Sequence, residues 1–480
     1  MTGINFITGF LKNKIYAIYL GLSGLGVISQ FTSSISFLTY LLPLGFPVGI
    51  TQLIAQSKDK DKSFTTEIIY TAFVILLLPV LLTFFTVFFF SSNISIFLFN
   101  EVTYSGYIKI LSIVIPFLVF FSVIEAILKG LGNISLYVKS LVLSSVVSFI
   151  VSIPLVIIAG IRGAAIGLTV NYIFFVLYSL YKFRKSGLGE FKPANLKFNK
   201  KILKQILKIG TAFLVAGAMY QLSLVIMKRM VIEKYGLDGS GLFQSIFNIS
   251  LFYFGFIFTS MSSYTFPKIA GLFNNTDLTS ELNTTIRFIS LVMVPLILIL
   301  VVFRNIIILI LYTPEFLIAE PFFQFQFLGD FFKALSWVLG IWLIPRSKIF
   351  FFLLFDILLN LNLIFIFKYL LDYTEFGIKG ASFAYMAAYI IHFLFNLILS
   401  RKTIGFRFTK KNLNLIFSSL TIIIILTFLS FQNFTYGYVL FLPVFLGWLF
   451  LNLSMDEIRG MKKVLKNFLK SRINIKDNTQ

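Results

Sequence analysis

The sequence predicts an all-α integral membrane protein with about 14 transmembrane helices, on the strength of three observations. Hydrophobic residues make up 58% of the 480 positions and charged residues only 12%, whereas soluble domains carry roughly 25% charge. Apolar runs of about 20 residues, long enough to span a bilayer, recur along the chain between short polar stretches. The runs are continuous rather than alternating, which favours helices over the strands of a β-barrel.

The individual spans follow from the borders of these apolar runs. Lys12, Asn13 and Lys14 interrupt the first span. No signal-peptide cleavage site follows it, so the span is expected to act as its own insertion signal. The predicted helices cover residues 3–20, 27–56, 65–90, 107–129, 135–158, 163–183, 205–232, 241–270, 284–312, 320–344, 347–370, 378–400, 412–430 and 434–452.

Basic residues gather in the connections that follow even-numbered predicted helices. The odd-numbered connections are poor in them, and residues 21–26 contain none. Because cytoplasmic loops of membrane proteins are rich in Lys and Arg, both termini are predicted to be cytoplasmic. The net charge of +22 is then explained by loops near anionic lipid headgroups, and nucleic acid is not an expected partner. The basic clusters lie within 58–62, 182–201, 401–411 and 459–476.

Several kinds of chemistry are excluded by what the sequence lacks. It contains no cysteine and a single histidine, His392, so disulfides and Cys- or His-cluster metal sites are excluded. No phosphate-cradling glycine motif is present, so bound nucleotide is not expected to supply energy. No nucleophile–base set stands out either, and the chain is expected to be neither an enzyme nor a cofactor protein.

An internal repeat divides the chain into two comparable halves. The sequence GLSGLG at 21–26 returns as GLDGSG at 236–241, and GIRGA at 160–164 returns as GIKGA at 377–381. The offsets are 215 and 217 residues, or six predicted helices. Two six-helix lobes with the same topology are therefore predicted around a central cavity, the architecture of a transporter that works by alternating access.

The repeat also defines the expected domain organisation. Two lobes are joined by a basic cytoplasmic linker, and a helix pair and a basic cytoplasmic tail follow the second lobe. The ranges are 1–183 for the N-terminal lobe, 184–204 for the linker, 205–400 for the C-terminal lobe, 412–452 for the extra pair and 453–480 for the tail.

Cations lie at matching positions in the first helix of each half. Lys12 and Lys14 precede Gly21, and the offset of 215 places Lys228 on Asn13 and Arg229 on Lys14. Charges inside a bilayer cost at least about 2.5 kcal/mol each, so their presence needs a reason. One interpretation is a positively charged cavity that suits an anionic substrate. The other is that these side chains snorkel to the headgroup region.

Other polar residues inside the spans are candidates for ion coupling or for lining a cavity. Asp330 and Lys333 share a helix face and can pair, either structurally or as a proton or substrate site, and Glu125 and Lys129 form a similar pair. Asp356 has no cation one turn away, which makes it a candidate for ion coupling, whereas His392 is more typical of a packing residue. Amides that either line a cavity or join helices are Gln30, Gln52, Asn171 and Gln221.

The run from Lys12 to Gly26, followed by a second helix that ends in QLIAQ at 52–56, resembles the start of Wzx-type polysaccharide flippases. These are O-antigen and enterobacterial common antigen translocases of the multidrug/oligosaccharidyl-lipid/polysaccharide exporter superfamily. The architecture is similar over essentially the whole chain. The sequence likeness is specific around 10–56 and its echo at 225–271.

The resemblance implies a function, a location and partners. The chain would move undecaprenyl-pyrophosphate-linked oligosaccharides from the inner to the outer leaflet of the bacterial inner membrane, for O-antigen, capsule or exopolysaccharide synthesis. Lys14 and Arg229, helped by Lys12 and Lys228, would attract the pyrophosphate. Partners would be membrane lipids, a polysaccharide polymerase and a chain-length regulator. The few acidic residues in the helices leave proton coupling open.

Three alternative functions remain. A multidrug exporter of the same superfamily is disfavoured because lysines, rather than acids, occupy the first helix. A polysaccharide polymerase or other membrane enzyme would need a sizeable external loop, and none of the predicted ones is long. A passive channel is compatible with a charged cavity, but the repeat favours a rocking transporter.

Overall fold

The computed structural model describes residues 2–56, 62–185, 198–432, 434–453 and 457. Within these ranges every regular element is a helix, and the predicted all-α membrane fold is confirmed. Parts of the predicted linker and tail, with the basic clusters at 58–61, 192–197 and 459–476, lie outside the described residues.

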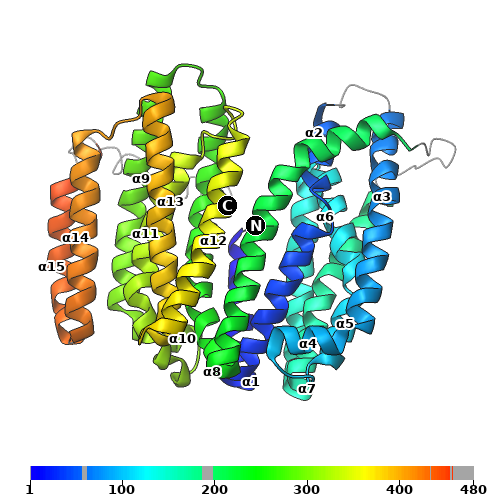
Figure 1. The fold of residues 1–480 in the computed structure, drawn as a ribbon, viewed down its shortest axis with the longest axis horizontal. Coiled ribbons are helices and arrows are strands. Elements are labelled where there is room, and N and C mark those ends of the chain that lie inside the picture. The colour runs from blue at the N-terminus through cyan, green and yellow to red at the C-terminus, as the bar shows by residue number, and fades with distance from the viewer. Residues whose placement is uncertain (1, 57–61, 186–197, 433, 454–456, 458–480) are drawn as a thin grey trace, which may run out of the picture.

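The chain forms two groups of helices with a long helix between them (Figure 1). The N-terminal group comprises α1 (Thr2–Leu41), α2 (Phe46–Gln56), α3 (Lys62–Phe89), α4 (Ser91–Phe99), α5 (Ser105–Ser112), α6 (Ile115–Gly130) and α7 (Ile134–Lys185). The C-terminal group comprises α9 (Asn275–Val302), α10 (Arg304–Leu311), η2 (Pro314–Phe322), α11 (Phe323–Gly340), α12 (Ile349–Tyr373), η3 (Gly377–Lys379) and α13 (Gly380–Ile404). Helix α8 (Lys200–Ala270) joins the groups, and α14 (Lys410–Gln432) and α15 (Phe434–Asn452) flank the C-terminal group.

Single glycines replace three of the four loops predicted at the two copies of the repeat, and the fourth, between α12 and η3, is a short connection that ends at Gly377. Gly21, Gly160 and Gly236 bend α1, α7 and α8 with φ values of +66°, +55° and +68°, and Gly377 follows α12 with φ +58°. Positive φ is unfavourable for residues with a Cβ, which explains why glycine stands at all four positions. Gly21 and Gly236 correspond in the repeat, as do Gly160 and Gly377.

The bends account for the number of spans. Among the described residues, nine helices are long and apolar enough to cross a membrane, and three of them are α1, α7 and α8. Each of these three makes two crossings, because its glycine reverses the chain. The nine helices therefore make twelve crossings, and α11 and α15 bring the number to the fourteen spans that the sequence predicts.

Some predicted boundaries differ from the structure. The span predicted at 27–56 stops at Leu41 and resumes at Phe46, because Leu44 and Gly45 both have positive φ. The span predicted at 284–312 is broken between α9 and α10. Helix α4 was not predicted at all, since its nine residues are too few to cross a bilayer.

The two groups meet closely at one end and lean apart at the other (Figure 1). The bends of α1 and α8 lie at the narrow end, and the ends of α2, α7 and α13 lie at the wide end. At the narrow end the seam is reciprocal. A Cβ on Gly26 would lie 2.2 Å from the carbonyl oxygen of Leu237, and one on Gly241 would lie 2.1 Å from that of Leu22. Such mutual contacts between repeat-equivalent positions are typical of an interface with two-fold symmetry.

Helix α8 begins on the N-terminal group and continues onto the C-terminal group. At the wide end the backbones of Gly45 and Gly210 touch, since a Cβ on Gly210 would lie 2.0 Å from the Gly45 carbonyl oxygen. Gly217 then packs on the ring of Tyr40. Only two turns later, the hydroxyl of Ser223 donates to Asn360 of α12 at 2.9 Å.

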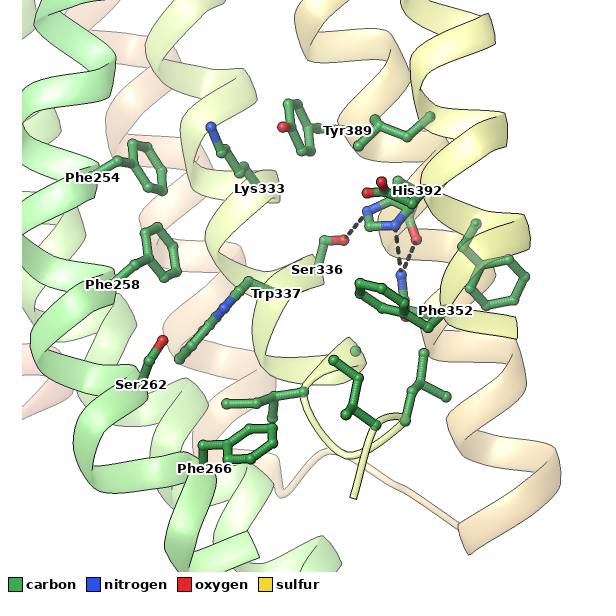
Figure 2. Close-up of a pocket in the computed structure, with 18 of the residues that line it drawn as sticks. Phe254, Phe258, Ser262, Phe266, Lys333, Ser336, Trp337, Phe352, Tyr389 and His392 are labelled. Atoms are coloured by element: carbon green, nitrogen blue, oxygen red, sulfur yellow. Dashed lines mark hydrogen bonds between the residues drawn. The ribbon is translucent and has the colours of Figure 1, made fainter. Parts of the chain in front are cut away.

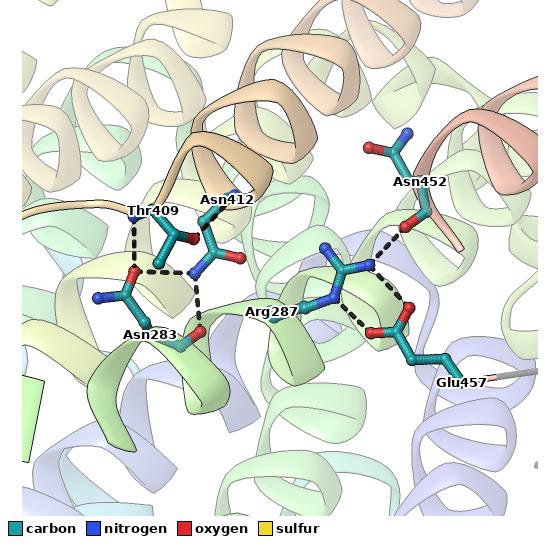
Figure 3. Close-up of polar contacts among 6 residues, drawn as sticks. All are labelled: Asn283, Arg287, Thr409, Asn412, Asn452 and Glu457. Carbon is teal, nitrogen blue, oxygen red and sulfur yellow. Dashed lines mark hydrogen bonds and ion pairs between the residues drawn. The ribbon is translucent and has the colours of Figure 1, made fainter. Parts of the chain in front are cut away.

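Polar side chains hold the extra helix pair against α9 (Figure 3). The Asn412 amide donates to the Asn283 carbonyl oxygen at 2.8 Å, and the Thr409 backbone N–H donates to the Asn283 side chain at 3.1 Å. Arg287 donates to the Asn452 carbonyl oxygen at 2.6 Å and forms a forked ion pair with Glu457. These bonds therefore anchor the pair α14–α15 to α9 at the wide end of the molecule.

Candidate functional site

One candidate site is an aromatic cavity of about 840 Å³ within the C-terminal group, between α8, α11, α12 and α13. Phe254 and Phe258 point from consecutive turns of α8, and their rings stack at 4.7 Å. Trp337 of α11 meets Phe258 edge-to-face at 4.8 Å (Figure 2). This volume lies in the range of small-molecule sites, roughly 300–1,000 Å³. We call it the C-terminal cavity.

Lys333 lines this cavity, Asp330 is buried behind it, and the two share one partner. The phenol of Tyr385 donates to the Asp330 carboxylate at 2.8 Å and accepts from the Lys333 ammonium at 3.1 Å. Asp330 also accepts from Ser250 and Tyr253 and is fully buried. The predicted pair is thus bridged by Tyr385, and among the described ion pairs the two do not form a direct one.

Asp356 and His392 line the same cavity. His392 is held by Ser336, 2.5 Å from its Nδ1, and by the Asn396 amide, 3.2 Å from its Nε2 (Figure 2). The histidine is therefore part of a packed network, in line with the packing interpretation of the sequence. Asp356 contributes a carboxylate to the cavity wall from α12.

A second cavity, also of about 840 Å³, lies at the wide end between α1, α2, α6 and α8. Its charged lining residues, Glu125 and Lys129, form the predicted ion pair at 2.5 Å. Glu125 also accepts from the Tyr137 phenol at 2.9 Å. Gln52, one of the predicted cavity amides, lines this N-terminal cavity. Its fixed charges balance one another.

A smaller pocket of about 200 Å³ lies between the two groups. Lys12 and Asn13 line it from α1, and Gln244 and Asn248 line it from the second half of α8. Lys12 donates to Ser148 at 2.7 Å and is the one charged residue among the described lining residues. This interlobe pocket is therefore electropositive and rich in hydrogen-bond donors.

The other three predicted cations contact protein at the narrow half of the interface. Lys14 donates to the carbonyl oxygens of Leu309, at 2.7 Å, and Tyr312 at the end of α10. Arg229 lies over the Phe97 ring of α4, 4.3 Å from its centroid. Lys228 is buried and donates to the Ser29 carbonyl oxygen at 2.9 Å and the Ser33 hydroxyl at 2.6 Å. Lys12 alone among the four lines one of the three cavities.

The remaining predicted amides are dispersed. Gln30 is buried and donates to the Val225 carbonyl oxygen at 3.3 Å, so it joins helices across the interface. Asn171 and Gln221 are half-buried in α7 and α8.

Two features of the region escaped prediction from sequence. The first is Arg304, which is completely buried and pairs with Glu320 at 2.6 Å. Its charge directly after a long apolar run was the signal that could have predicted a buried ion pair. The aromatic wall of the C-terminal cavity gave no signal, because phenylalanine is abundant throughout the chain.

Comparisons with known proteins show which family and which relatives the chain resembles. Residues 19–321 match the family model described as "Polysaccharide biosynthesis protein". The Lipid III flippase of Escherichia coli (strain K12) is 24% identical over 385 residues, which cover 80% of this chain and 92% of the relative.

Solved structures show the same fold. A multidrug resistance MATE family transporter of the MOP superfamily, in an inward-facing conformation, matches with a TM-score of 0.75 at 15% identity, covering 84% of this chain and 95% of that one. The Lipid II flippase MurJ in an inward closed conformation matches with a TM-score of 0.72 at 20% identity, covering 93% and 96%.

Proposed function

Because the chain belongs to this family of polysaccharide biosynthesis proteins, we propose that it is a flippase for lipid-linked oligosaccharides. The observation that carries the proposal is the asymmetry between its ends. The narrow end is sealed by backbone contacts at Gly26 and Gly241, and two cavities lie between the helices toward the wide end. A transporter that works by alternating access has this form when it is open to one side. Similarity to a Lipid III flippase supports the substrate class.

The proposed substrate is an undecaprenyl-pyrophosphate-linked oligosaccharide, moved from the inner to the outer leaflet of the bacterial inner membrane. The ends of α6, α7 and α13, which carry Lys129, Lys185 and Arg401, lie at the wide end, and the positive-inside rule supports a cytoplasmic position for that end. Both termini would then be cytoplasmic. The lobes are residues 1–183 and 205–400 in this proposal, with 412–452 as a peripheral pair. A polymerase and a chain-length regulator would act on the product.

The pyrophosphate would bind first near Lys12, because the interlobe pocket joins a cation to amide donors. Lys14, Lys228 and Arg229 are engaged within the seam in the present state. Opening of the narrow end would break these contacts and turn their charges toward the opened cavity. The four cations would then serve the anionic group in sequence rather than as one preformed site.

A multidrug exporter is the second candidate, since solved proteins of this fold include one. The interlobe pocket argues against it, because Lys12 would repel a cationic drug. Transport, rather than polymerisation or glycosyl transfer, is the function proposed for this architecture.

The first test is the distribution of lipid-linked sugars in a strain that lacks the protein. Polyprenyl-pyrophosphate oligosaccharides would be extracted and assigned to a leaflet by their accessibility in sealed vesicles. Completed units should collect in the cytoplasmic leaflet while surface polysaccharide is lost. Normal delivery to the outer leaflet would contradict the proposal, and a drug-efflux assay would then test the alternative.

A further inference from the structure

We propose that the C-terminal cavity binds the glycan of the lipid-linked substrate and does not bind its pyrophosphate. The inference rests on the proposed function and assigns one part of the substrate to one place. The rings of Phe254, Phe258 and Trp337 form a continuous aromatic surface along α8 and α11 (Figure 2). Apolar faces of this kind pack against the C–H faces of sugar rings, with polar groups around them to fix orientation.

The charges of the cavity exclude a phosphate group. Lys333 is the one cation among the described lining residues, and Asp330 stands behind it on the shared phenol of Tyr385. Asp356 adds a further carboxylate to the wall. One ammonium and two carboxylates give the cavity no net positive charge. A pyrophosphate placed here would meet the Asp356 carboxylate without a free cation to bind it. The interlobe pocket, where Lys12 lies with Asn13, is better suited to that group.

The cavity offers the polar groups that sugar hydroxyls need. Asp356 can accept, and among the described residues no side-chain hydrogen bond reaches its carboxylate. Ser262 and Ser263 contribute hydroxyls on the α8 side. Donors and acceptors thus surround the aromatic wall, and a neutral polyhydroxylated ligand could bond to both kinds.

The other ligand that aromatic rings and a carboxylate could take is an organic cation. Lys333 argues against it, because the ammonium already occupies the ring faces. It lies 4.8 Å from the centroid of Phe254 and 5.3 Å from that of Tyr389. A second cation would be repelled from the same faces, so a glycan is the favoured ligand. Binding of an organic cation is tested directly with a cationic probe.

Tryptophan fluorescence provides a direct assay, because the chain has only three tryptophans, Trp337, Trp342 and Trp448. Replacing Trp342 and Trp448 by phenylalanine leaves Trp337 as the single emitter inside the cavity. The purified double variant would be titrated with three probes. These are the oligosaccharide released by mild acid from the lipid-linked pool of the deletion strain, undecaprenyl pyrophosphate, and tetraphenylphosphonium.

The oligosaccharide should shift or quench Trp337 emission in a saturable way, and the other two probes should not. Phe258→Ala should weaken oligosaccharide binding roughly three- to tenfold, the range expected for one lost aromatic contact. Phe258→Tyr keeps the ring and should bind normally. A response to undecaprenyl pyrophosphate or to tetraphenylphosphonium without one to the oligosaccharide overturns the assignment.

The two proposals fail in different ways. If the cavity assignment alone is wrong, Trp337 does not respond to the oligosaccharide although the deletion strain still retains lipid-linked units in the cytoplasmic leaflet. If the flippase proposal is wrong, the leaflet distribution in the deletion strain is normal whatever Trp337 shows. Leaflet distribution and fluorescence are measured independently, so neither result can hide the other.

Discussion

Lys14 and Arg229 occupy the same position in the two repeats and cross the interface in opposite directions. Lys14 bonds to the backbone of Tyr312, and Arg229 covers the ring of Phe97. Phe97 and Tyr312 are themselves 215 residues apart, the same offset that separates the two cations. Ser23 and Asp238, another equivalent pair, hydrogen-bond to each other. The cations therefore form two halves of one symmetric clasp at the narrow end.

Loss of the clasp should favour opening of the narrow end. Lys14→Gln removes charged hydrogen bonds worth about 1.5–3 kcal/mol each, so the open population should rise roughly tenfold or more. A cysteine placed at buried Ser240 reports this opening as faster thiol labelling, without background because the chain has no cysteine.

Lys208→Gln, an exposed change on the first part of α8, is the matched control and should leave the labelling rate unchanged. Equal labelling rates in Lys14→Gln and the parent would show that the clasp does not hold the seam. Separately, full export in cells with Lys14→Glu or Arg229→Glu at normal protein level would refute their role with the substrate.

The glycine seam should tolerate no added methyl group. In Gly26→Ala the new Cβ would meet the Leu237 carbonyl oxygen at 2.2 Å, and backbone cannot move aside as a side chain can. Overpacking of this kind costs about 1–3 kcal/mol, and here it should also impair export. Gly447→Ala serves as the control, because a Cβ added there would meet nothing within 4 Å. Thermal stability in detergent and export in cells measure the two effects.

The buried Arg304 should be the most sensitive charged residue for folding. It donates to Glu320 at 2.8 Å and to the Ser430 carbonyl oxygen at 2.9 Å, and its side chain is fully buried. Arg304→Met should destabilise the protein by about 3–5 kcal/mol, because Glu320 loses its partner. Adding Glu320→Gln should recover part of that loss. If Arg304→Met and Glu320→Gln, each made alone, have the melting temperature of the parent, the ion pair does not contribute to stability.

The contact that docks the extra helix pair should be weaker. Asn412→Leu removes two bonds to Asn283, and interhelical hydrogen bonds in membranes average about 0.6 kcal/mol with a maximum near 1.7. A small drop in melting temperature is expected, with export retained. Loss of export at unchanged stability would instead assign the pair a part in transport.

The fold was predictable from sequence because its signals are coarse. Apolar runs set the number of spans, and the repeated glycines marked the points where the chain turns. The length of the turns was not predictable, since a single residue with positive φ, such as Gly21, does the work expected of a six-residue loop.

The site was less accessible to sequence reasoning. Position in the repeat matched Lys14 to Arg229, but sequence could not reveal that each reaches a different partner across the interface. The spacing of Asp330 and Lys333 indicated a shared face, yet the bridging phenol of Tyr385 comes from another helix. Contacts between distant segments carry no local pattern, and the aromatic cavity is built from such contacts.

The path of α8 limits how the two halves can move. Its start packs on the turn before α2 through the Gly45–Gly210 contact, and beyond Tyr220 it is bonded to α12 through Ser223. Rotation of one half against the other would therefore bend the short stretch of α8 between Gly217, which packs on Tyr40, and Ser223. Bending of that segment would cost elastic energy whenever the halves change their angle, so a stiffer segment should narrow the range of their motion.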